Sequence, residues 1–216
     1  MNAMLDIDLI VVNANARYEG KDLIHYYRHV MRAPNAKVPY HNVRHMLHVP
    51  WEAYDGADRM GLDPRTFRNV MIAALMHDYN HTGVKNDDAV NIERAIRALH
   101  QLALEEDRPY MLDIQRMIEA TRYPYGDRAF ELPDLILRDA DQSQTFSVAW
   151  IQSVMYGLST ELEISPDKML RDQLPYLESL KFYTLWGQNK FGPLIQPRIE
   201  LVKRLIRLSG EEVEQP

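Results

Sequence analysis

The stretch Val70-Met71-Ile72-Ala73-Ala74-Leu75-Met76-His77-Asp78 places a histidine and an aspartate directly after seven apolar residues. An uninterrupted apolar run of this kind is consistent with a buried helix. Such a helix would carry a polar pair at its end, and buried polar groups need partners. His77 and Asp78 meet that need if they share a metal ion, and a carboxylate with two oxygens can also bridge to a second ion.

The hydrophobic pattern around this stretch is helical along nearly the whole chain. Apolar residues recur at three- and four-residue spacing, whereas alternating runs rich in β-branched residues are scarce. Asp63-Pro64 and Ser165-Pro166 each put a capping side chain before a proline suited to the first helical position, and Gly61 and Gly210 mark helix ends. The pattern predicts an all-α fold.

The chain of 216 residues is expected to form a single domain over 1–216, with its core motifs within about 40–145. It has no internal repeat and no linker rich in glycine and serine. Pro50 is expected to kink the second of the predicted helices. The predicted helices cover 4–32, 41–60, 64–80, 88–105, 109–122, 131–142, 146–163, 166–185 and 193–209.

Composition and charge limit the partners. A formal net charge of -6 and a pI near 5.7 argue against a protein that binds nucleic acid through many phosphates. The chain has no stretch of the roughly 20 apolar residues that a membrane-spanning helix needs, and its start does not resemble a signal peptide. We therefore expect no nucleic acid and no membrane partner, and a cytoplasmic location.

The chain contains no cysteine, so thiolate nucleophiles and zinc sites built on sulfur are excluded. Nitrogen and oxygen are then the only ligands for a metal. Four of the eight histidines fall in two groups, Tyr40-His41-Asn42-Val43-Arg44-His45 and His77-Asp78-Tyr79-Asn80-His81-Thr82-Gly83-Val84-Lys85-Asn86. His41 and His45 project from one face of a helix, because they stand four residues apart.

A third group, Leu135-Ile136-Leu137-Arg138-Asp139-Ala140-Asp141-Gln142-Ser143, is another apolar helical segment that ends in carboxylates. The order of the three groups is similar to that of the HD-domain superfamily of metal-dependent phosphohydrolases. Within it, the two histidine groups closely resemble the motifs of class I cyclic nucleotide phosphodiesterases. The similarity runs from about Tyr40 to Gln144 and includes Ile118-Glu119-Ala120-Thr121 and Ala140-Asp141-Gln142-Ser143.

The resemblance implies an HD-domain helical bundle that holds divalent metal ions, expected to be two. The tighter ion would be bound by His45, His77, Asp78 and Asp141. Asp78 would bridge to the second ion, whose other ligands would be mostly water. Histidine and carboxylate ligands suit Fe, Mn, Zn, Co or Mg, so the identity of the metal stays open.

The resemblance also implies the roles of other side chains. A metal-bridging hydroxide would attack phosphorus, and His41 would protonate the departing oxygen as general acid. His81 and Asn86 would orient waters and phosphate oxygens. His48 and His100 match nothing in the motifs and are expected to be ordinary helix residues.

Three further points concern the comparison with the motifs. Asp139 and Asp141 are alternatives for one ligand, and the Ala-Asp-x-Ser pattern selects Asp141, leaving Asp139 solvated or hydrogen-bonded. Asp88 stands where the phosphodiesterase motif usually has an apolar residue. Gln188 is the candidate for the glutamine that holds the base in those enzymes.

The expected substrate is a small nucleotide. The first hypothesis is hydrolysis of a 3′,5′-cyclic nucleotide to its 5′-monophosphate. One alternative is a 5′-nucleotidase of the HD type, which removes phosphate from a monoester. Another is a module that binds metal and senses a nucleotide without turning it over. The sequence predicts neither the base preference nor the oligomeric state.

Overall fold

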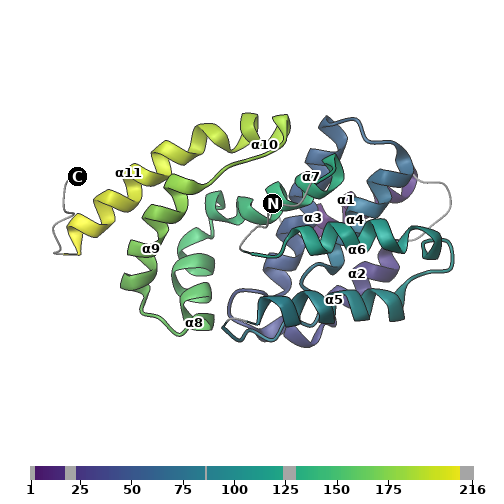
Figure 1. The fold of residues 1–216 in the computed structure, drawn as a ribbon, viewed down its shortest axis with the longest axis horizontal. Coiled ribbons are helices and arrows are strands. Elements are labelled where there is room, and N and C mark those ends of the chain that lie inside the picture. Colours follow the sequence, from purple (N-terminus) through teal and green to yellow (C-terminus); the bar gives the residue numbers. More distant parts are fainter. Residues whose placement is uncertain (1–2, 18–22, 86, 124–129, 210–216) are drawn as a thin grey trace.

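The computed structural model describes residues 3–17, 23–85, 87–123 and 130–209. These residues form helices and no strand, so the prediction of an all-α fold is confirmed (Figure 1). Short 3₁₀ helices cover η1 (Pro34–Lys37), η2 (Arg108–Tyr110) and η3 (Ser143–Phe146), and η4 (Ile151–Leu158) is a π-helix. The α-helices are α1 (Ala3–Arg17), α2 (Ile24–Val30), α3 (Val43–Arg59), α4 (Pro64–Met76), α5 (Asp88–Leu102), α6 (Met111–Ala120), α7 (Leu132–Gln142), α8 (Ser159–Glu161), α9 (Pro166–Ser179), α10 (Leu185–Lys190) and α11 (Gly192–Leu208).

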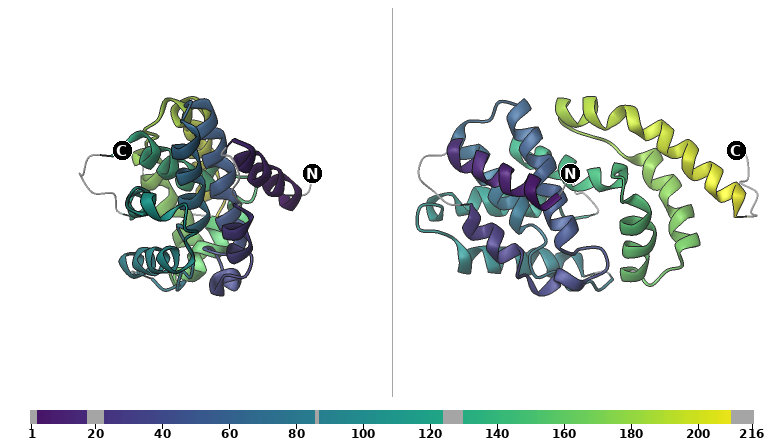
Figure 2. Two further views of the ribbon diagram at one scale, coloured as in Figure 1. Left: turned by 90° about the vertical axis from the view of Figure 1, so that its right-hand side faces the viewer. Right: turned by 180° about the vertical axis from the view of Figure 1, so that it is seen from behind.

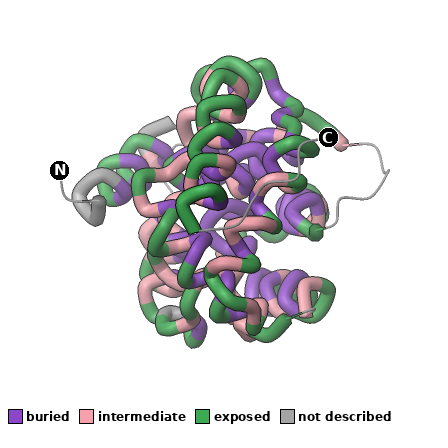
Figure 3. The backbone as a smooth tube through the Cα atoms, turned by 90° about the vertical axis from the view of Figure 1, so that its left-hand side faces the viewer, coloured by how far each residue is buried: buried purple, intermediate pink, exposed green. Residues whose placement is uncertain are grey.

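Helix α4 lies at the centre of the core. The Asp63 side chain caps it by accepting hydrogen bonds from the backbone N–H groups of Arg65 and Thr66, and Pro64 occupies its first turn. Every residue from Phe67 to Met76 is buried, and α4 contacts α3, α6 and α7. Buried segments gather in the interior of the molecule and exposed segments lie on its outside (Figure 3). Each fully buried Val, Leu, Ile or Met side chain stabilises the fold by about 1.5–3 kcal/mol. The apolar run is therefore the buried helix that the sequence predicts.

The helices fall into two neighbouring groups (Figures 1 and 2). Helices α1 to α7 pack around α4, whereas η4, α8, α9 and α11 pack on one another to one side. Helix α10 links the groups, because it contacts α3 and α7 as well as α11. The residues that end α4 and α7 share a cavity with side chains of η4 and α9, so the ends that carry the predicted ligands face the second group.

Three of the predicted helix boundaries are wrong. The range 4–32 contains two helices, α1 and α2, separated by residues outside the described ranges. The range 166–185 is interrupted after Ser179, because the Thr184 side chain accepts the N–H of Gly187 and so starts α10 as a separate helix. The range 146–163 is largely the π-helix η4, which an α-helical period cannot reveal.

Two further expectations concern single residues. Pro50 lies inside α3, which continues from Val43 to Arg59. Gly210 lies outside the described residues, although α11 ends just before it at Leu208. In the described part of the chain, no helix combines the length and the apolarity that crossing a bilayer requires.

Candidate metal centre

Three helices deliver the four predicted ligands to one place. Helix α3 starts at Val43, where the Asn42 side chain accepts the N–H of Arg44, and carries His45 in its first turn. His77 is the C-cap residue of α4, and Asp78 follows it directly. Asp141 lies in the last turn of α7. Because α3 packs against both α4 and α7, the predicted ligands meet where these helices approach one another.

The distances between the ligand atoms suit a common metal ion. The Nε2 atom of His45 lies 3.1 Å from Asp78 Oδ2 and 3.2 Å from Asp141 Oδ1. The Nε2 atom of His77 lies 3.1 Å from Asp78 Oδ2, 3.4 Å from His45 Nε2 and 3.7 Å from Asp141 Oδ1. Ligands that bind one ion at about 2.0–2.2 Å are themselves about 3.0–3.6 Å apart. His45, His77 and Asp78 therefore form a group that could hold one metal ion, and Asp141 Oδ1 lies beside its two histidines.

The hydrogen bond of His77 to the backbone sets its tautomer. Its Nδ1 lies 2.8 Å from the carbonyl oxygen of Ala74, which can only accept a hydrogen bond, so Nδ1 carries the hydrogen. Nε2 is left with its lone pair directed at the ligand set. A metal-binding histidine ordinarily has this arrangement.

The electrostatics of the set favour a cation. Burial lowers the pKa of His45, but Asp141 and Asp78 outweigh this effect and raise it to about 10. Burial raises the pKa of Asp78, yet the neighbouring His77 and His41 hold it well below its usual value. Asp78 Oδ2 is buried, and within the described residues it has ion-pair contacts with His45 and His77 at 3.1 Å but no hydrogen bond of good geometry. A positive charge at the centre would meet the need of these carboxylates.

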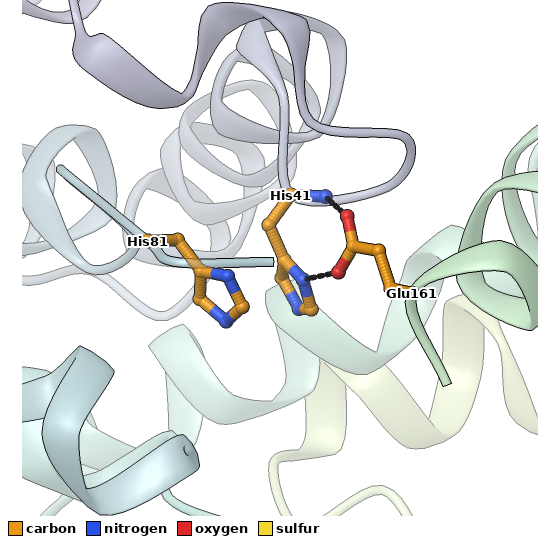
Figure 4. A group of neighbouring side chains, drawn as sticks. All are labelled: His41, His81 and Glu161. Carbon is orange, nitrogen blue, oxygen red and sulfur yellow. Dashed lines mark hydrogen bonds and ion pairs between the residues drawn. The ribbon is translucent and has the colours of Figure 1, made fainter. Parts of the chain in front are cut away.

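A second cluster lies beside the first and contains His41, His81 and Glu161 (Figure 4). Glu161 Oε2 lies 2.6 Å from His41 Nδ1, and Oε1 accepts the backbone N–H groups of Tyr40 and His41 at 2.6 and 2.9 Å. The buried carboxylate thus fixes both the backbone and the ring of His41. Within the described residues, His41 Nε2 has no hydrogen-bond partner.

His81 stacks on His41, with ring centroids 3.7 Å apart. Its Nδ1 accepts the N–H of Gly83 at 3.0 Å, and its Nε2 lies 2.9 Å from the amide nitrogen of Asn91. Burial, followed by the charge on His41, lowers the pKa of His81 to about 4. In a neutral His81, Gly83 uses the lone pair of Nδ1 and Nε2 carries the hydrogen, so His81 is a poorer metal ligand than the side chains of the first cluster.

Asn35 connects the two histidine motifs, and the sequence offers no signal for it. Its side chain is buried and donates hydrogen bonds to the carbonyl oxygens of His41 and Asp78, at 2.6 and 3.0 Å. Its Oδ1 accepts the N–H of Asn80 at 2.9 Å. Asn35 therefore holds the segments that carry His41 and Asp78 at a fixed separation.

A cavity of about 600 Å³ opens beside both clusters. His41, His81, Asp78 and Asp141 line it on the side of the helices around α4. The second group of helices supplies an apolar side, formed by Val154, Leu158, Leu162, Met169 and Tyr176. The amides of Gln142 and Gln173 also line the cavity.

Other predicted residues lie elsewhere. Gln188 does not line this cavity, and its amide donates to the carbonyl oxygen of Phe182 at 3.2 Å. Asn86 lies outside the described residues. Asp139 is fully buried and accepts hydrogen bonds from Tyr183 and Thr184, so it is a hydrogen-bonded residue, as the choice of Asp141 requires.

Sequence reasoning missed Glu161, because no motif marks it. The only signal is a carboxylate in the largely apolar helical stretch that precedes Ile164. A comparison with known protein families finds no family model that matches this chain, and no curated protein matches it either. The geometry of the site is therefore what supports a function.

Proposed function

We propose that this protein is a metal-dependent phosphohydrolase of the HD-domain type that opens a 3′,5′-cyclic nucleotide to its 5′-monophosphate. One observation carries the proposal. Four ligand atoms from His45, His77, Asp78 and Asp141 converge, with 3.1–3.7 Å separating the nearest pairs, next to His41 in a cavity large enough for a nucleotide.

The donor set fits one tightly bound divalent ion, because it combines two imidazoles with two carboxylates. Asp78 has a second oxygen with which it can reach another ion. When bound, such ions supply Lewis acidity that lowers the pKa of water and neutralises charge on phosphate oxygens.

His41 supplies the proton that the reaction needs. Opening the cyclic diester adds water to phosphorus and breaks the bond between phosphorus and O3′, so O3′ must gain a proton. With Nδ1 held by Glu161, His41 presents Nε2 as the nitrogen that can give this proton. The Glu161 carboxylate fixes the direction of the ring, so the imidazole needs little rearrangement when the bond breaks.

The lining of the cavity suits both the phosphate and the base of a nucleotide. A nucleotide has a charged phosphate at one end and a flat, largely apolar base at the other. The phosphate would lie near Asp78 and Asp141 through the metal ions, and the base would lie against the apolar side chains of η4 and α9. Gln142 and Gln173 offer hydrogen bonds to the base edge.

The test compares two phosphodiesters that differ in their leaving group. His41→Ala should bind metal normally and should lose about 10²- to 10⁴-fold in the rate of cyclic nucleotide opening, the usual contribution of a general acid. On bis(4-nitrophenyl) phosphate, whose leaving group departs without a proton, the same variant should lose much less. The matched control is His100→Ala, which changes an exposed histidine of α5.

Equal losses on both diesters would contradict the acid role of His41. Loss of metal from His41→Ala would show that His41 is a ligand. His45→Ala and Asp78→Ala should lose both metal and turnover. Release of phosphate from nucleoside monophosphates alone would favour the nucleotidase, and tight nucleotide binding without hydrolysis by the metal-loaded protein would favour the sensing module.

A further inference from the structure

His48 and Ser143 form a hydrogen bond behind the proposed metal centre. His48 lies on α3, three residues after His45, and Ser143 follows α7, two residues after Asp141. The Nε2 atom of His48 lies 2.8 Å from Ser143 Oγ. The contact therefore joins the two helices that carry His45 and Asp141, close to both residues in the sequence.

The carbonyl oxygen of Ala140 determines which group donates in each of these hydrogen bonds. Ser143 Oγ lies 2.6 Å from the carbonyl oxygen of Ala140, which can only accept, so the serine hydroxyl donates there. Its single hydrogen is then used, and Ser143 Oγ must accept from His48. His48 Nε2 therefore carries a hydrogen. The same carbonyl oxygen also accepts the backbone N–H of Ser143, which closes the last turn of α7.

The direction of the Asp141 carboxylate depends on the backbone of this turn. Its ion pairs are with His45 and His77, at 3.2 and 3.7 Å, and both partners are themselves proposed ligands. Within the described residues, no other hydrogen bond to the carboxylate is present. A shift of the end of α7 would therefore move the Asp141 oxygen away from the other ligands.

We propose that His48 is a positioning residue for the metal centre, because its hydrogen bond to Ser143 holds the end of α7 against α3. The inference rests on the proposed metal centre and goes beyond it. His48 does not bind the metal or the substrate. It acts through Ser143 and the carbonyl oxygen of Ala140, next to Asp141, and is thus more than the ordinary helix residue that the sequence predicts.

Cobalt(II) binding to the whole protein tests the inference, with His48→Leu and His48→Gln as the main variants. The affinity comes from competition with a chelator, and the absorption spectrum of bound Co(II) reports on the ligand geometry. Leucine keeps bulk and removes the donor, whereas glutamine keeps an N–H donor at a comparable reach. Ser143→Ala removes only the hydroxyl group that accepts this hydrogen bond, and it tests the same contact if His48→Leu does not fold.

The control variant is His25→Leu. His25 is another half-buried histidine, and its Nε2 lies 2.7 Å from the carbonyl oxygen of Leu102 in a different part of the molecule. The control should lower the thermal unfolding temperature without changing Co(II) affinity or the spectrum.

His48→Leu and Ser143→Ala should each weaken Co(II) binding by about 10- to 100-fold and alter the spectrum, as loss of groups behind metal ligands usually does. His48→Gln should restore most of both properties. The double variant should bind Co(II) about as tightly as the single variant with the lower affinity, because the two residues act through one contact.

Wild-type affinity and spectrum in folded His48→Leu and Ser143→Ala would overturn the inference and leave the contact a matter of packing. Failure of His48→Gln to restore either property would overturn it as well. If the wild-type protein itself binds no Co(II), the metal centre fails and the positioning role fails with it, which is a different result from unchanged affinity in the variants.

Discussion

Asp139 and Asp141 stand two residues apart in α7, but their carboxylates have different surroundings. Asp139 is fully buried and accepts the N–H groups of Tyr183 and Thr184 at 2.9 and 2.8 Å. We expect Asp139→Asn to lower the free energy of unfolding by about 1.5–3 kcal/mol, because an amide replaces a charged acceptor, and to keep the metal. Asp141→Asn should lose metal affinity with a smaller effect on unfolding. Urea denaturation and metal content, measured on both variants, check this.

The opposite pattern, with metal lost from Asp139→Asn and retained by Asp141→Asn, would mean that the ligand is misassigned. Reduced metal content in both variants would point to movement of α7 as a whole.

The motifs of the sequence were enough to name the side chains that meet at the site, and they were not enough to name their supports. His45, His77, Asp78 and Asp141 lie together, as the resemblance of the motifs implies. Glu161 reaches His41 across 120 residues of sequence, and His48 reaches Ser143 across 95. Periodicity identifies the face of a helix, but it does not identify which distant helix that face meets.

At the scale of elements, a buried ionic network fastens α2, α4 and the segment before η2. Asp107 accepts hydrogen bonds from Arg68 Nε and Arg65 Nη1, both at 2.8 Å, and from Tyr26 Oη at 2.8 Å. The Asp107 and Arg68 side chains are 0% exposed. Removing Asp107 would take away the fully buried counter-charge of Arg68 and leave it paired with the partly exposed Glu106 at 2.8 Å.

We expect Asp107→Asn to destabilise the protein by about 3–5 kcal/mol at neutral pH. Burial raises the pKa of Asp107, but hydrogen bonds from Arg68 and Arg65 outweigh this and lower it from 3.8. The carboxylate therefore adds stability above pH 3.8, and that stability is lost as the pH falls through the folded-state pKa. Urea unfolding as a function of pH should show a shallower loss in acid for Asp107→Asn.

The control for this measurement is Glu105→Gln, which alters an exposed pair with Arg108 on the same segment. It should change the free energy of unfolding by no more than about 0.5 kcal/mol. An equal effect of the two substitutions would show that burial of the network adds nothing to its contribution to stability.

Helix boundaries were predictable where a local cap sets them. Helix α4 begins at Pro64 because Asp63 caps it, and both residues are visible in the sequence. The end of α9 was not predictable, because Asp139 accepts the N–H groups of Tyr183 and Thr184 and holds the following segment from a distant helix. The π-helix η4 likewise has no local signal in the sequence.

At the scale of the whole molecule, the site depends on the contact between the two groups of helices. A Cβ atom on Gly157 of η4 would lie 2.6 Å from the carbonyl oxygen of Pro39, which is closer than real contacts. Gly157→Ala should therefore push η4 away and pull Glu161 from His41. We expect about a 100-fold loss of turnover with normal metal content, measured by single-substrate kinetics and elemental analysis.

Gly192→Ala is the matched control, because a Cβ at Gly192 meets nothing within 4 Å. It should turn over substrate at the wild-type rate. Loss of metal from Gly157→Ala would show that metal binding also depends on the second group of helices. Unchanged turnover would show that the position of Glu161 does not limit the reaction.

The apolar side of the cavity comes from chain that follows the last proposed metal ligand, since Val154, Leu158, Met169 and Tyr176 all lie beyond Asp141. Substitutions in that later stretch can reshape the cavity without touching a ligand. Related proteins that differ in this stretch would therefore differ in substrate while they keep the same proposed metal ligands. Exchanging the stretch after Asp141 between two such proteins is expected to exchange their substrate specificity.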